Sequence, residues 1–419
     1  MNQIKILKQN VRHISRMLRS KQDLAWPFHQ FERNIHPETW KKHDAYLMWA
    51  LRCAENAVTL EKPELYEASD DPIVRQGYAL ARGVRQQFQG KYRDVQNLRI
   101  LVHVPPSSVS PGGYSLFTNF LTSLDYLGIP TRALEWGQAI ETHLREFNPT
   151  LFMTSDHGEY LNKIDWNAVS KYRQVHALKV GLTASPEEQG NAPLHDRLDW
   201  ARLHDVTFYY SFHSPEHLSS HNGYTRFFER GYRIHSIEFG ANPLLYYPVP
   251  NIQRDINFVF LASSNQDKWD RYFKYLPALL SRYTGVVDGP GWSHSARWSP
   301  PPAHRYLYAR AKVGINLHIT DSINWPSELN ERTYILAACG VPQLLDNPKL
   351  LRDRFSEGCF FVANDPEEYF SLFQHIIANR IEARQRALLA QREVFARHTT
   401  FHRADDFITR ITTGLAGSN

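Results

Sequence analysis

The sequence predicts an α/β protein with two Rossmann-like, doubly wound domains behind an N-terminal helical extension. Its 419 residues are 42% hydrophobic and 22% charged, which is enough globular chain for two ordinary cores. From residue 98 onward, short apolar segments rich in β-formers alternate with helical segments, and this alternation is typical of parallel sheets. A proline-rich stretch at 240–257 separates two such series, so we place the domain boundary there.

Composition argues against several other classes of protein. No run approaches the roughly 18 to 20 consecutive apolar residues of a membrane span, and the N-terminus lacks the pattern of a secretory signal, so we expect a cytoplasmic protein. Cys53, Cys339 and Cys359 are far apart and outside any metal-ligand spacing. Neither a disulfide framework nor a metal site is therefore expected.

The extension, residues 1–95, begins with a basic segment. The first 22 residues hold six Lys and Arg side chains and no acidic one, so the rest of the chain has a formal charge of −1 and no nucleic-acid partner is expected. Five aliphatic residues recur there at helical spacing: Ile4, Leu7, Val11, Ile14 and Leu18. This helix either lies on an anionic membrane surface through residues 4–21 or packs its apolar face on the neighbouring domain. Further helices are expected from residue 37 to about residue 89.

Residues 96–245 are predicted to form the first Rossmann-like domain. Strands are expected at 98–104, 150–154, 177–183, 206–211 and 234–239. After the first strand we expect a loop with Gly112 and Gly113, and then a helix over 114–127. Ligands of such sheets bind beyond the carboxyl ends of the strands. Gly112 and Gly113 therefore form a candidate acceptor loop, in which a substrate group or a phosphate approaches the backbone closely. A simple tight turn explains the same pair.

Residues 246–395 are predicted to form the second domain, and 396–419 belong to a last helix, over 382–411, that crosses back. Strands are expected at 258–262, 283–287, 311–318 and 341–345.

Two segments after these strands suit a phosphorylated ligand. Ser263 and Ser264 follow the first strand and precede a helix with Lys268 and Arg271, so amides and cations there form a phosphate cradle, although capping and solvated charge explain them too. A tight turn from Gly289 to Trp292 follows the second strand, and the Trp292 ring is a stacking face for a base.

The segment NERTYILAACGVPQLLD, residues 330–346, is the most informative part of the sequence. Asn330 or Ser327 caps a helix that runs to Gly340, and the strand at 341–345 follows it. The N-terminus of a helix carries partial positive charge, so a nucleotide diphosphate fits there with Arg332 as a charged ligand. The same segment also fits an ordinary helix–strand packing unit.

This segment resembles the glycosyl transferases group 1 superfamily, in the branch similar to spore-maturation protein B-like glycosyltransferases. The matching positions are Asn330, Arg332, Tyr334, Ala338, Cys339, Gly340, Leu344 and Leu345. The Gly-Pro-Gly-Trp turn at 289–292 and the Gly-Ala-Asn-Pro sequence at 240–243 also look like that branch. The resemblance extends over residues 98–400 and is strongest after residue 255.

The resemblance implies a GT-B fold, with two Rossmann-like domains that face a cleft, and a hexosyl- or related transferase activity. A sugar would pass from a nucleotide-diphosphate donor to a glycan or lipid-linked acceptor in cell-surface polysaccharide or glycoconjugate synthesis, on the inner membrane face if the basic helix binds lipid. The nucleotide sugar is a co-substrate, so no cofactor or metal is implied, and Lys268, Arg271 and Arg332 would stabilise the leaving diphosphate. A non-catalytic GT-B-like sugar- or partner-binding protein and a sugar-nucleotide epimerase are the alternatives.

One position departs from the family pattern. Ile335 stands where the family has a glutamate that is expected to bind the donor ribose, and isoleucine accepts no hydrogen bond. Three explanations are open. Glu331 or Glu328 takes over the role of the family glutamate, the donor differs from the usual donor of the family, or the protein has lost catalysis. The donor-binding candidates are Ser263, Ser264, Lys268, Arg271, Gly289, Trp292, Asn330, Glu331, Arg332 and Tyr334.

Three residues in the first domain are candidate catalytic groups. An inverting transfer needs a general base for the acceptor hydroxyl, and a histidine or carboxylate suits that task. Asp156 and His157 follow the strand at 150–154, and His213 follows the strand at 206–211. Because the chain has 20 histidines, most of them serve as ordinary hydrogen-bonded or surface residues.

Overall fold

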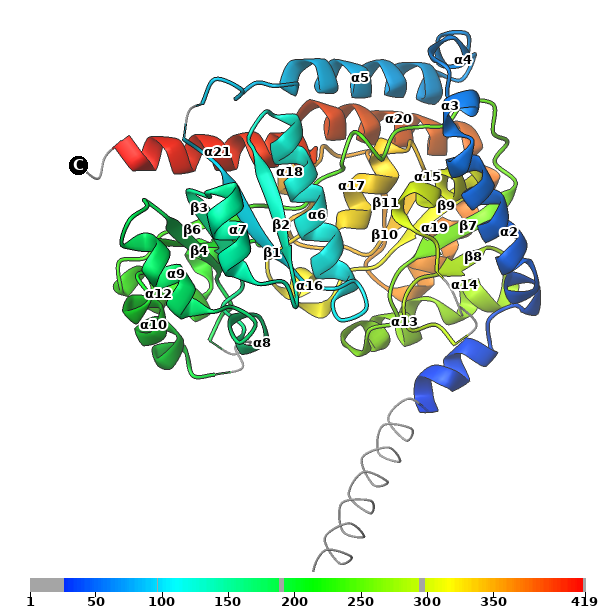
Figure 1. Cartoon of the computed structure of the whole chain (residues 1–419). Helices are drawn as coiled ribbons and strands as arrows, with labels where there is room; N and C mark the ends of the chain where they lie inside the picture. The colour runs from blue at the N-terminus through cyan, green and yellow to red at the C-terminus, as the bar shows by residue number, and fades with distance from the viewer. Residues whose placement is uncertain (1–25, 96, 188–191, 294–297, 417–419) are drawn as a thin grey trace, which may run out of the picture.

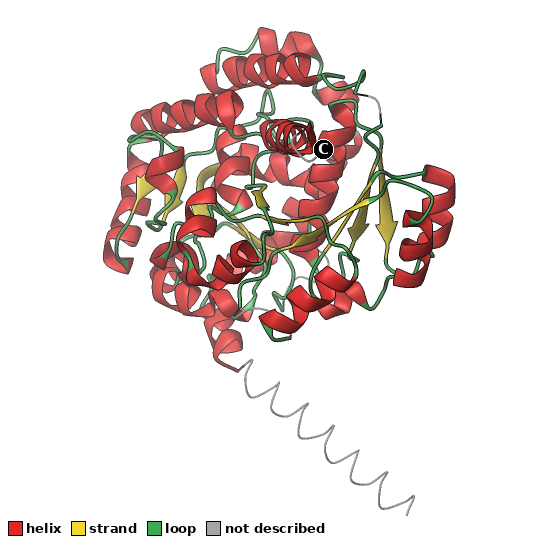
Figure 2. Ribbon diagram, turned by 90° about the vertical axis from the view of Figure 1, so that its left-hand side faces the viewer, coloured by secondary structure: helices red, strands yellow, loops and turns green. Residues whose placement is uncertain are grey.

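The computed structural model describes residues 26–95, 97–187, 192–293 and 298–416 and contains two parallel sheets (Figure 1). The first sheet has six strands in the order β2-β1-β3-β4-β5-β6, and the second has five in the order β11-β10-β9-β7-β8. Helices flank both sheets (Figure 2). The predicted fold class, two Rossmann-like domains after a helical extension, is confirmed. The membrane-binding interpretation of residues 4–21 lies outside the described residues.

The first domain contains the five strands that the apolar segments predicted and one further strand, β2, which they did not predict. Its strands are β1 Ile100–Val104, β2 Thr131–Glu135, β3 Leu151–Thr154, β4 Lys179–Thr183, β5 Phe208–Ser211 and β6 Ile234–Ser236. Its helices are α6 Pro111–Tyr126, α7 Ile140–Phe147, α8 Gly158–Leu161, α9 Trp166–Arg173, α10 Leu194–Leu203, α11 Pro215–Ser220, the 3-10 turn η1 Asn222–Tyr224 and α12 Thr225–Glu229.

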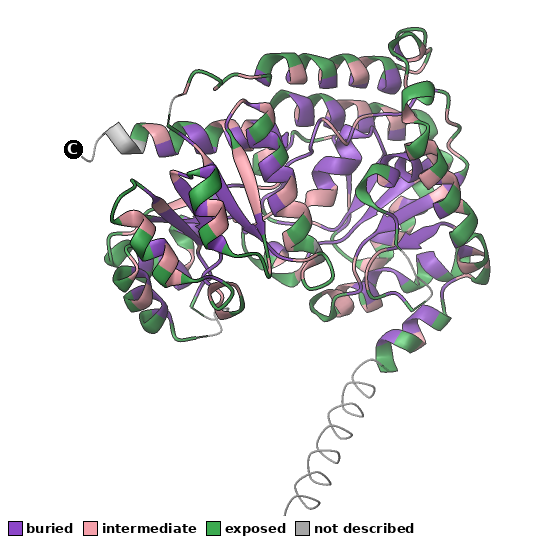
Figure 3. Cartoon of the chain, viewed as in Figure 1, coloured by how far each residue is buried: buried purple, intermediate pink, exposed green. Residues whose placement is uncertain are grey.

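The second domain follows the proline-rich stretch. Its strands are β7 Ile256–Leu261, β8 Val286–Asp288, β9 Ala311–Asn316, β10 Gln343–Leu345 and β11 Phe361–Val362. Its helices are the 3-10 turn η2 Gln266–Lys268, α13 Trp269–Tyr275, α14 Pro277–Arg282, α15 Pro301–Arg310, α16 Thr320–Asn324, α17 Glu331–Ala338, α18 Leu351–Arg354, α19 Pro366–Ala378 and α20 Arg380–Arg397. The central strands of both sheets are buried, as Figure 3 shows.

Gly112 and Gly113 lie in the first turn of α6, so the loop expected there is wrong. Ser110 caps the helix, because its Oγ accepts a hydrogen bond from the Gly113 amide at 3.3 Å, and Pro111 occupies the first helical position. Proline is well suited to that position, since its missing amide has no partner there in any helix. The pair therefore belongs to a helix N-terminus that follows β1.

The last helical segment is also broken where one helix was expected. α20 ends at Arg397, and α21 covers Thr400–Ala416. At the break, Thr399 forms an isolated bridge with Ala241 of the linker. α21 then crosses to the first domain, where the Phe407 ring meets Phe120 of α6 at 5.3 Å.

The N-terminal extension packs on the second domain. Residues 26–33 are helical, and the later helices of the extension are α2 Pro37–Glu55, α3 Ala57–Leu60, α4 Pro63–Glu67 and α5 Pro72–Phe88. Helix α2 covers the edge strand β8, and there Nε2 of the buried His43 lies 3.2 Å from Oδ1 of Asp288. Helix α5 lies beside α20 (Figure 1). The edge of the sheet is thus covered by chain from the start of the protein, which prevents pairing with another strand.

Candidate active site

Segments that follow the strands of the two sheets meet at the N-terminus of α17. His213 follows β5, and its Nδ1 lies 3.5 Å from Oε2 of Glu328, which precedes α17. Glu331, the first residue of α17, accepts a hydrogen bond from Nδ2 of Asn119 on α6 at 2.9 Å. Residues from both domains thus approach one another beyond the carboxyl ends of the strands, where ligands of such sheets bind.

Asn330 and Arg332 fix the N-terminus of α17 to the second sheet. The Asn330 Oδ1 accepts from the Thr333 amide at 3.1 Å, which caps the helix as predicted. The Arg332 Nε donates to the Leu261 carbonyl at the end of β7 at 2.8 Å, and one terminal nitrogen donates to Oδ1 of Asn316 at 3.2 Å. A guanidinium has five N–H groups, so Arg332 keeps donors for a ligand while its position is set by the sheet.

Lys268 adds a second cation beside Arg332. Its Nζ donates to the Ser263 hydroxyl at 3.4 Å, so the residue after β7 and the turn η2 are in contact. Burial and the nearby Arg332 charge lower the pKa of Lys268 to about 8. Two cations held this close, next to the positive end of a helix, favour a bound anion.

The turn at Gly289 packs tightly against the segment after β7. Gly289 has a φ of +133°, and a Cβ there would lie 2.4 Å from the Ala262 carbonyl oxygen. The Ser264 amide donates to the Pro290 carbonyl at 2.9 Å. Only glycine allows this backbone approach, so the turn and the Ser263–Ser264 segment form one unit of fixed shape.

Arg271 is engaged inside the second domain. It donates to Oδ2 of Asp346 at 2.8 Å, and the other carboxylate oxygen lies 2.7 Å from Nδ1 of the fully buried His318. The Arg271 guanidinium also lies over the Tyr275 ring. Its charge is therefore balanced by Asp346.

Two aromatic candidates lie in hydrophobic cores. Trp292 is 3% exposed, stacks on Tyr272 and contacts Phe28 of the extension, so the ring that was predicted to stack on a base is covered. Tyr334 is 1% exposed and packs against Phe355. Both residues support the shape of the site from behind and offer no surface to a ligand in this conformation.

Ile335 is also part of a core, whereas both nearby glutamates face the meeting point of the domains. Ile335 is 5% exposed and belongs to the main hydrophobic cluster. Burial raises the pKa of Glu328 and the pKa of Glu331 to about 7 each. Carboxyl groups poised near neutrality are typical of sites that move protons, so Glu328, beside His213, joins the candidate catalytic groups.

Three histidines follow β5 at intervals of four residues. The ring centroids of His213 and His217 are 5.0 Å apart, and those of His217 and His221 are 4.6 Å apart. Burial lowers the pKa of His213 and the pKa of His217 to about 4, and their Nδ1 atoms have no hydrogen-bond partner among the described residues. Sequence analysis selected His213 alone, although the regular spacing of these histidines was visible.

The other catalytic candidates lie after β3. Asp156 is 3% exposed, and Arg197 donates to its Oδ2 at 2.5 Å while Ser185 donates to Oδ1 at 2.6 Å. A carboxylate so paired serves the packing of α10 on the sheet. His157 is half-buried at the start of α8. The structure brings neither residue to the N-terminus of α17, and their catalytic role stays a prediction.

A small cavity lies beside the N-terminus of α17. It has a volume of about 30 Å³ and lies between α6, the end of β6 and the start of α21, with Asn119 and Glu331 in its wall. Within residues 26–416, excluding the gaps, no group of three His, Cys, Asp or Glu side chains is placed to hold a metal ion. None of the helices in this same part of the chain is both long and apolar enough to cross a membrane.

A family model described as glycosyl transferase-like matches residues 271–409, which include α17 and the whole segment 330–346. No curated protein matches the chain. The match therefore lies in the second domain and the start of α21. It agrees with the superfamily that the sequence resembles, and it does not confirm the spore-maturation branch.

Solved structures of similar arrangement include three proteins of low identity. Sucrose-phosphate synthase from Thermosynechococcus elongatus is 13% identical, with 76% of this chain and 100% of that chain covered and a TM-score of 0.49. HepE from Anabaena, in complex with UDP-glucose, is 12% identical, with 75% and 100% covered and a TM-score of 0.46. The phage T4 β-glucosyltransferase, in complex with UDP-glucose, is 9% identical, with 77% and 100% covered and a TM-score of 0.47.

Proposed function

We propose that this protein is a glycosyltransferase that moves a hexose or related sugar from a nucleotide diphosphate to a glycan or lipid-linked acceptor. One observation carries the proposal: the cations Lys268 and Arg332 lie at the N-terminus of α17, next to the His213–Glu328 pair from the two domains. The match of residues 271–409 to the glycosyl transferase-like family supports it, because that match includes α17.

The donor side of the proposal is electrostatic. As the bond from sugar to diphosphate breaks, negative charge grows on the departing phosphate oxygens. Arg332 is held by Leu261 and Asn316, so its remaining N–H groups keep their direction without reorganisation. Fixed donors of this kind stabilise charge that develops in a transition state, and no metal or cofactor is needed for that task.

The acceptor side requires a group that removes a proton. Burial lowers the pKa of His213 to about 4, so its ring is neutral at pH 7, and its Nδ1 faces Oε2 of Glu328. Glu328 lies 3.5 Å away, and burial raises its pKa to about 7. We assign to this pair the acceptance of the acceptor's hydroxyl proton, since a base works best when its pKa lies near the working pH.

A function in cell-surface polysaccharide or glycoconjugate synthesis is part of the same proposal. A lipid-linked acceptor places the protein at the inner membrane face, where the basic residues 4–21 would bind anionic lipid. Support for this part comes from the sequence of that segment alone.

A non-catalytic sugar- or partner-binding protein is the second candidate. The observation that favours it is Ile335, which is buried in the hydrophobic core and leaves the family's ribose-binding position without an acceptor. Glu331 is a candidate substitute, and its carboxylate already accepts from Asn119 at 2.9 Å and from Ser115 at 3.3 Å. This candidate predicts that sugar or partner binding survives when the cations at α17 are removed.

A nucleotide panel separates the two candidates. Thermal unfolding would be measured with UDP, GDP, CMP and dTDP, and slow hydrolysis of the corresponding nucleotide sugars would be followed without acceptor. We expect one nucleotide to raise the Tm and its sugar to be hydrolysed, and we expect Arg332→Ala to lose both effects. Arg392→Ala is the matched control, because Arg392 binds only Gln76 on the surface. If none of the four nucleotides shifts the Tm, the glycosyltransferase proposal fails.

A further inference from the structure

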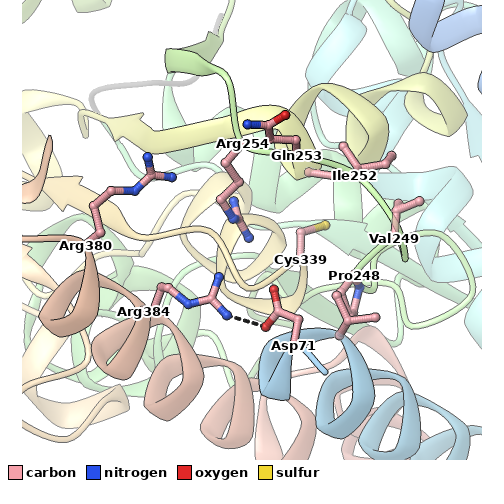
Figure 4. A pocket seen from close by; sticks show the side chains of 11 residues that line it. Asp71, Pro248, Val249, Ile252, Gln253, Arg254, Cys339, Arg380 and Arg384 are labelled. Atoms are coloured by element: carbon pink, nitrogen blue, oxygen red, sulfur yellow. Dashed lines mark hydrogen bonds and ion pairs between the residues drawn. The ribbon is translucent and has the colours of Figure 1, made fainter. Parts of the chain in front are cut away.

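A second cavity lies on the other side of the second domain from the N-terminus of α17. It has a volume of about 230 Å³ and is enclosed by α5, the linker, α15 and the start of α20 (Figure 4). Arg254 precedes β7 and Ala309 precedes β9, so the cavity lies at the amino ends of these strands. The candidate active site lies at their carboxyl ends. The cavity is therefore a separate feature that the proposed function does not use.

Positive charge dominates the wall of this cavity. Its ionisable side chains are three arginines and one aspartate: Arg254, Arg380, Arg384 and Asp71. Arg384 donates to Oδ1 of Asp71 at 2.6 Å, which balances one of the three cations. Arg380 makes no hydrogen bond or ion pair with any residue in the described part of the chain. Two positive charges therefore remain without a carboxylate in the wall.

Arg254 is anchored in the wall of the cavity by backbone carbonyls. Its terminal nitrogens donate to the carbonyls of Ala311 at 2.6 Å and Gly340 at 2.8 Å, and more weakly to Tyr308. Two of its five N–H groups are left over. Burial, together with the charges of Arg380 and Arg384, lowers its pKa to about 10, so the group is still charged at neutral pH. Neighbouring cations in a partly dry space repel one another, and a bound anion would remove that repulsion.

The first turn of α20 adds to this positive field. Arg380 and Arg384 lie in the first two turns of an 18-residue helix, and the N-cap residue Asn379 makes no side-chain capping bond. The amide groups of that turn therefore have no side-chain acceptor, and the positive end of the helix dipole favours an anion. Figure 4 shows Arg254, Arg380 and Arg384 along the wall of the cavity, with the Arg384 guanidinium directed at Asp71.

The remaining wall is apolar and suits a small organic group. Val74 of α5 and Pro248, Val249 and Ile252 of the linker line the side away from Arg380. The volume is below the roughly 300–1,000 Å³ of sites for drug-sized ligands, so a whole nucleotide is too large. We propose that this cavity binds a small phosphate monoester of about sugar size, with its phosphate on Arg254, Arg380 and Arg384 and its carbon body on the apolar wall.

Calorimetric titration with glucose 6-phosphate tests this proposal on the full chain. We expect the wild type to bind it, and we expect Arg380→Gln/Arg384→Gln to bind at least about tenfold more weakly, since two charge-assisted contacts are lost. Arg392→Gln is the control, because it removes a charge from the same helix outside the cavity. Arg332→Ala tests the location, since it removes a cation from the candidate active site only.

Each outcome decides the matter. Binding that survives Arg332→Ala and Arg392→Gln but weakens in the double variant supports the cavity. No binding to the wild type, equal binding to the double variant, or loss of binding in Arg332→Ala overturns the proposal. The single variant Arg380→Gln tests the cavity without disturbing the fold, because the Arg380 side chain is exposed and has no partner to lose. This variant should bind glucose 6-phosphate about threefold more weakly. Failure here leaves nucleotide binding at α17 unaffected, so the two proposals fail separately.

Discussion

Glu331 of α17 accepts a hydrogen bond from Asn119 of α6 at 2.9 Å, which joins the candidate donor helix to the first helix of the other domain. Asn119 accepts in turn from Asn242 of the linker at 3.0 Å. A buried carboxyl group thus connects three parts of the chain at the point where both domains meet. Burial raises its pKa to about 7, so its charge changes within the physiological range.

This contact predicts a pH-dependent effect on stability. The folded-state pKa of Glu331 is above the unfolded value, so the folded protein favours the neutral acid and loses stability as pH rises from about 4.5 through 7. Glu331→Gln is neutral and keeps one acceptor. We expect it to raise the free energy of unfolding by about 1–3 kcal/mol at pH 8 and by much less at pH 4.5. Urea unfolding at both pH values measures this, and an equal effect at both would contradict it.

The candidate catalytic groups predict a bell-shaped pH profile. Glu328 gains its charge above about pH 7, and Lys268 loses its charge above about pH 8, so kcat/KM for the donor should be highest between those values. Glu328→Gln should remove the acidic limb and lower kcat about 10²–10⁴-fold. Initial rates from pH 5.5 to 9.5 provide the measurement. An unchanged acidic limb in the variant would assign the proton to another group.

Two substitutions at Lys268 separate the effect of losing its charge from the effect of raising its pKa. Lys268→Met removes a cation from the proposed phosphate site and should weaken binding of the nucleoside diphosphate about tenfold or more. Lys268→Arg keeps the charge and should move the alkaline limb of the rate profile above pH 9.5, because arginine stays protonated. If the methionine variant binds the nucleotide as well as the wild type, Lys268 does not contact the phosphate.

The extension predicts a long-range effect on the donor half. His43 is 3% exposed and lies 3.2 Å from Asp288, the last residue of β8 and the neighbour of Gly289. His43→Ala should lower the free energy of unfolding by about 1–3 kcal/mol, since a buried polar partner and its packing are lost. His375→Ala, at the exposed pair with Glu382, should change it by less than about 0.5 kcal/mol. Thermal and urea unfolding measure the stability of both variants. Equal losses of stability in His43→Ala and His375→Ala would refute a special role for His43.

The strands found from sequence were those with continuous apolar runs. Ile100–Val104 and Ile256–Leu261 are central and almost wholly buried, so their composition reports their place directly. β2, with the sequence TRALE, was missed because it is an edge strand whose residues are mostly half-buried. β11 was missed because it has only two residues, too few for any pattern.

The site was predicted less completely, because its parts come from distant segments. Asn330 and Arg332 were recognisable from local helix chemistry, and the structure places both at the helix start. The burial of Trp292 depends on Phe28, more than 260 residues earlier, and no local pattern indicates that packing. The approach of Glu328 to His213 likewise requires the two domains to be assembled.

Calorimetric titration of the nucleoside diphosphate selected by the panel, into the wild type and Arg332→Ala, tests the central claim most directly. The account predicts that the wild type binds it with one site and that Arg332→Ala binds it about tenfold to a hundredfold more weakly. Equal affinity in the two proteins would contradict the assignment of the donor site to the N-terminus of α17.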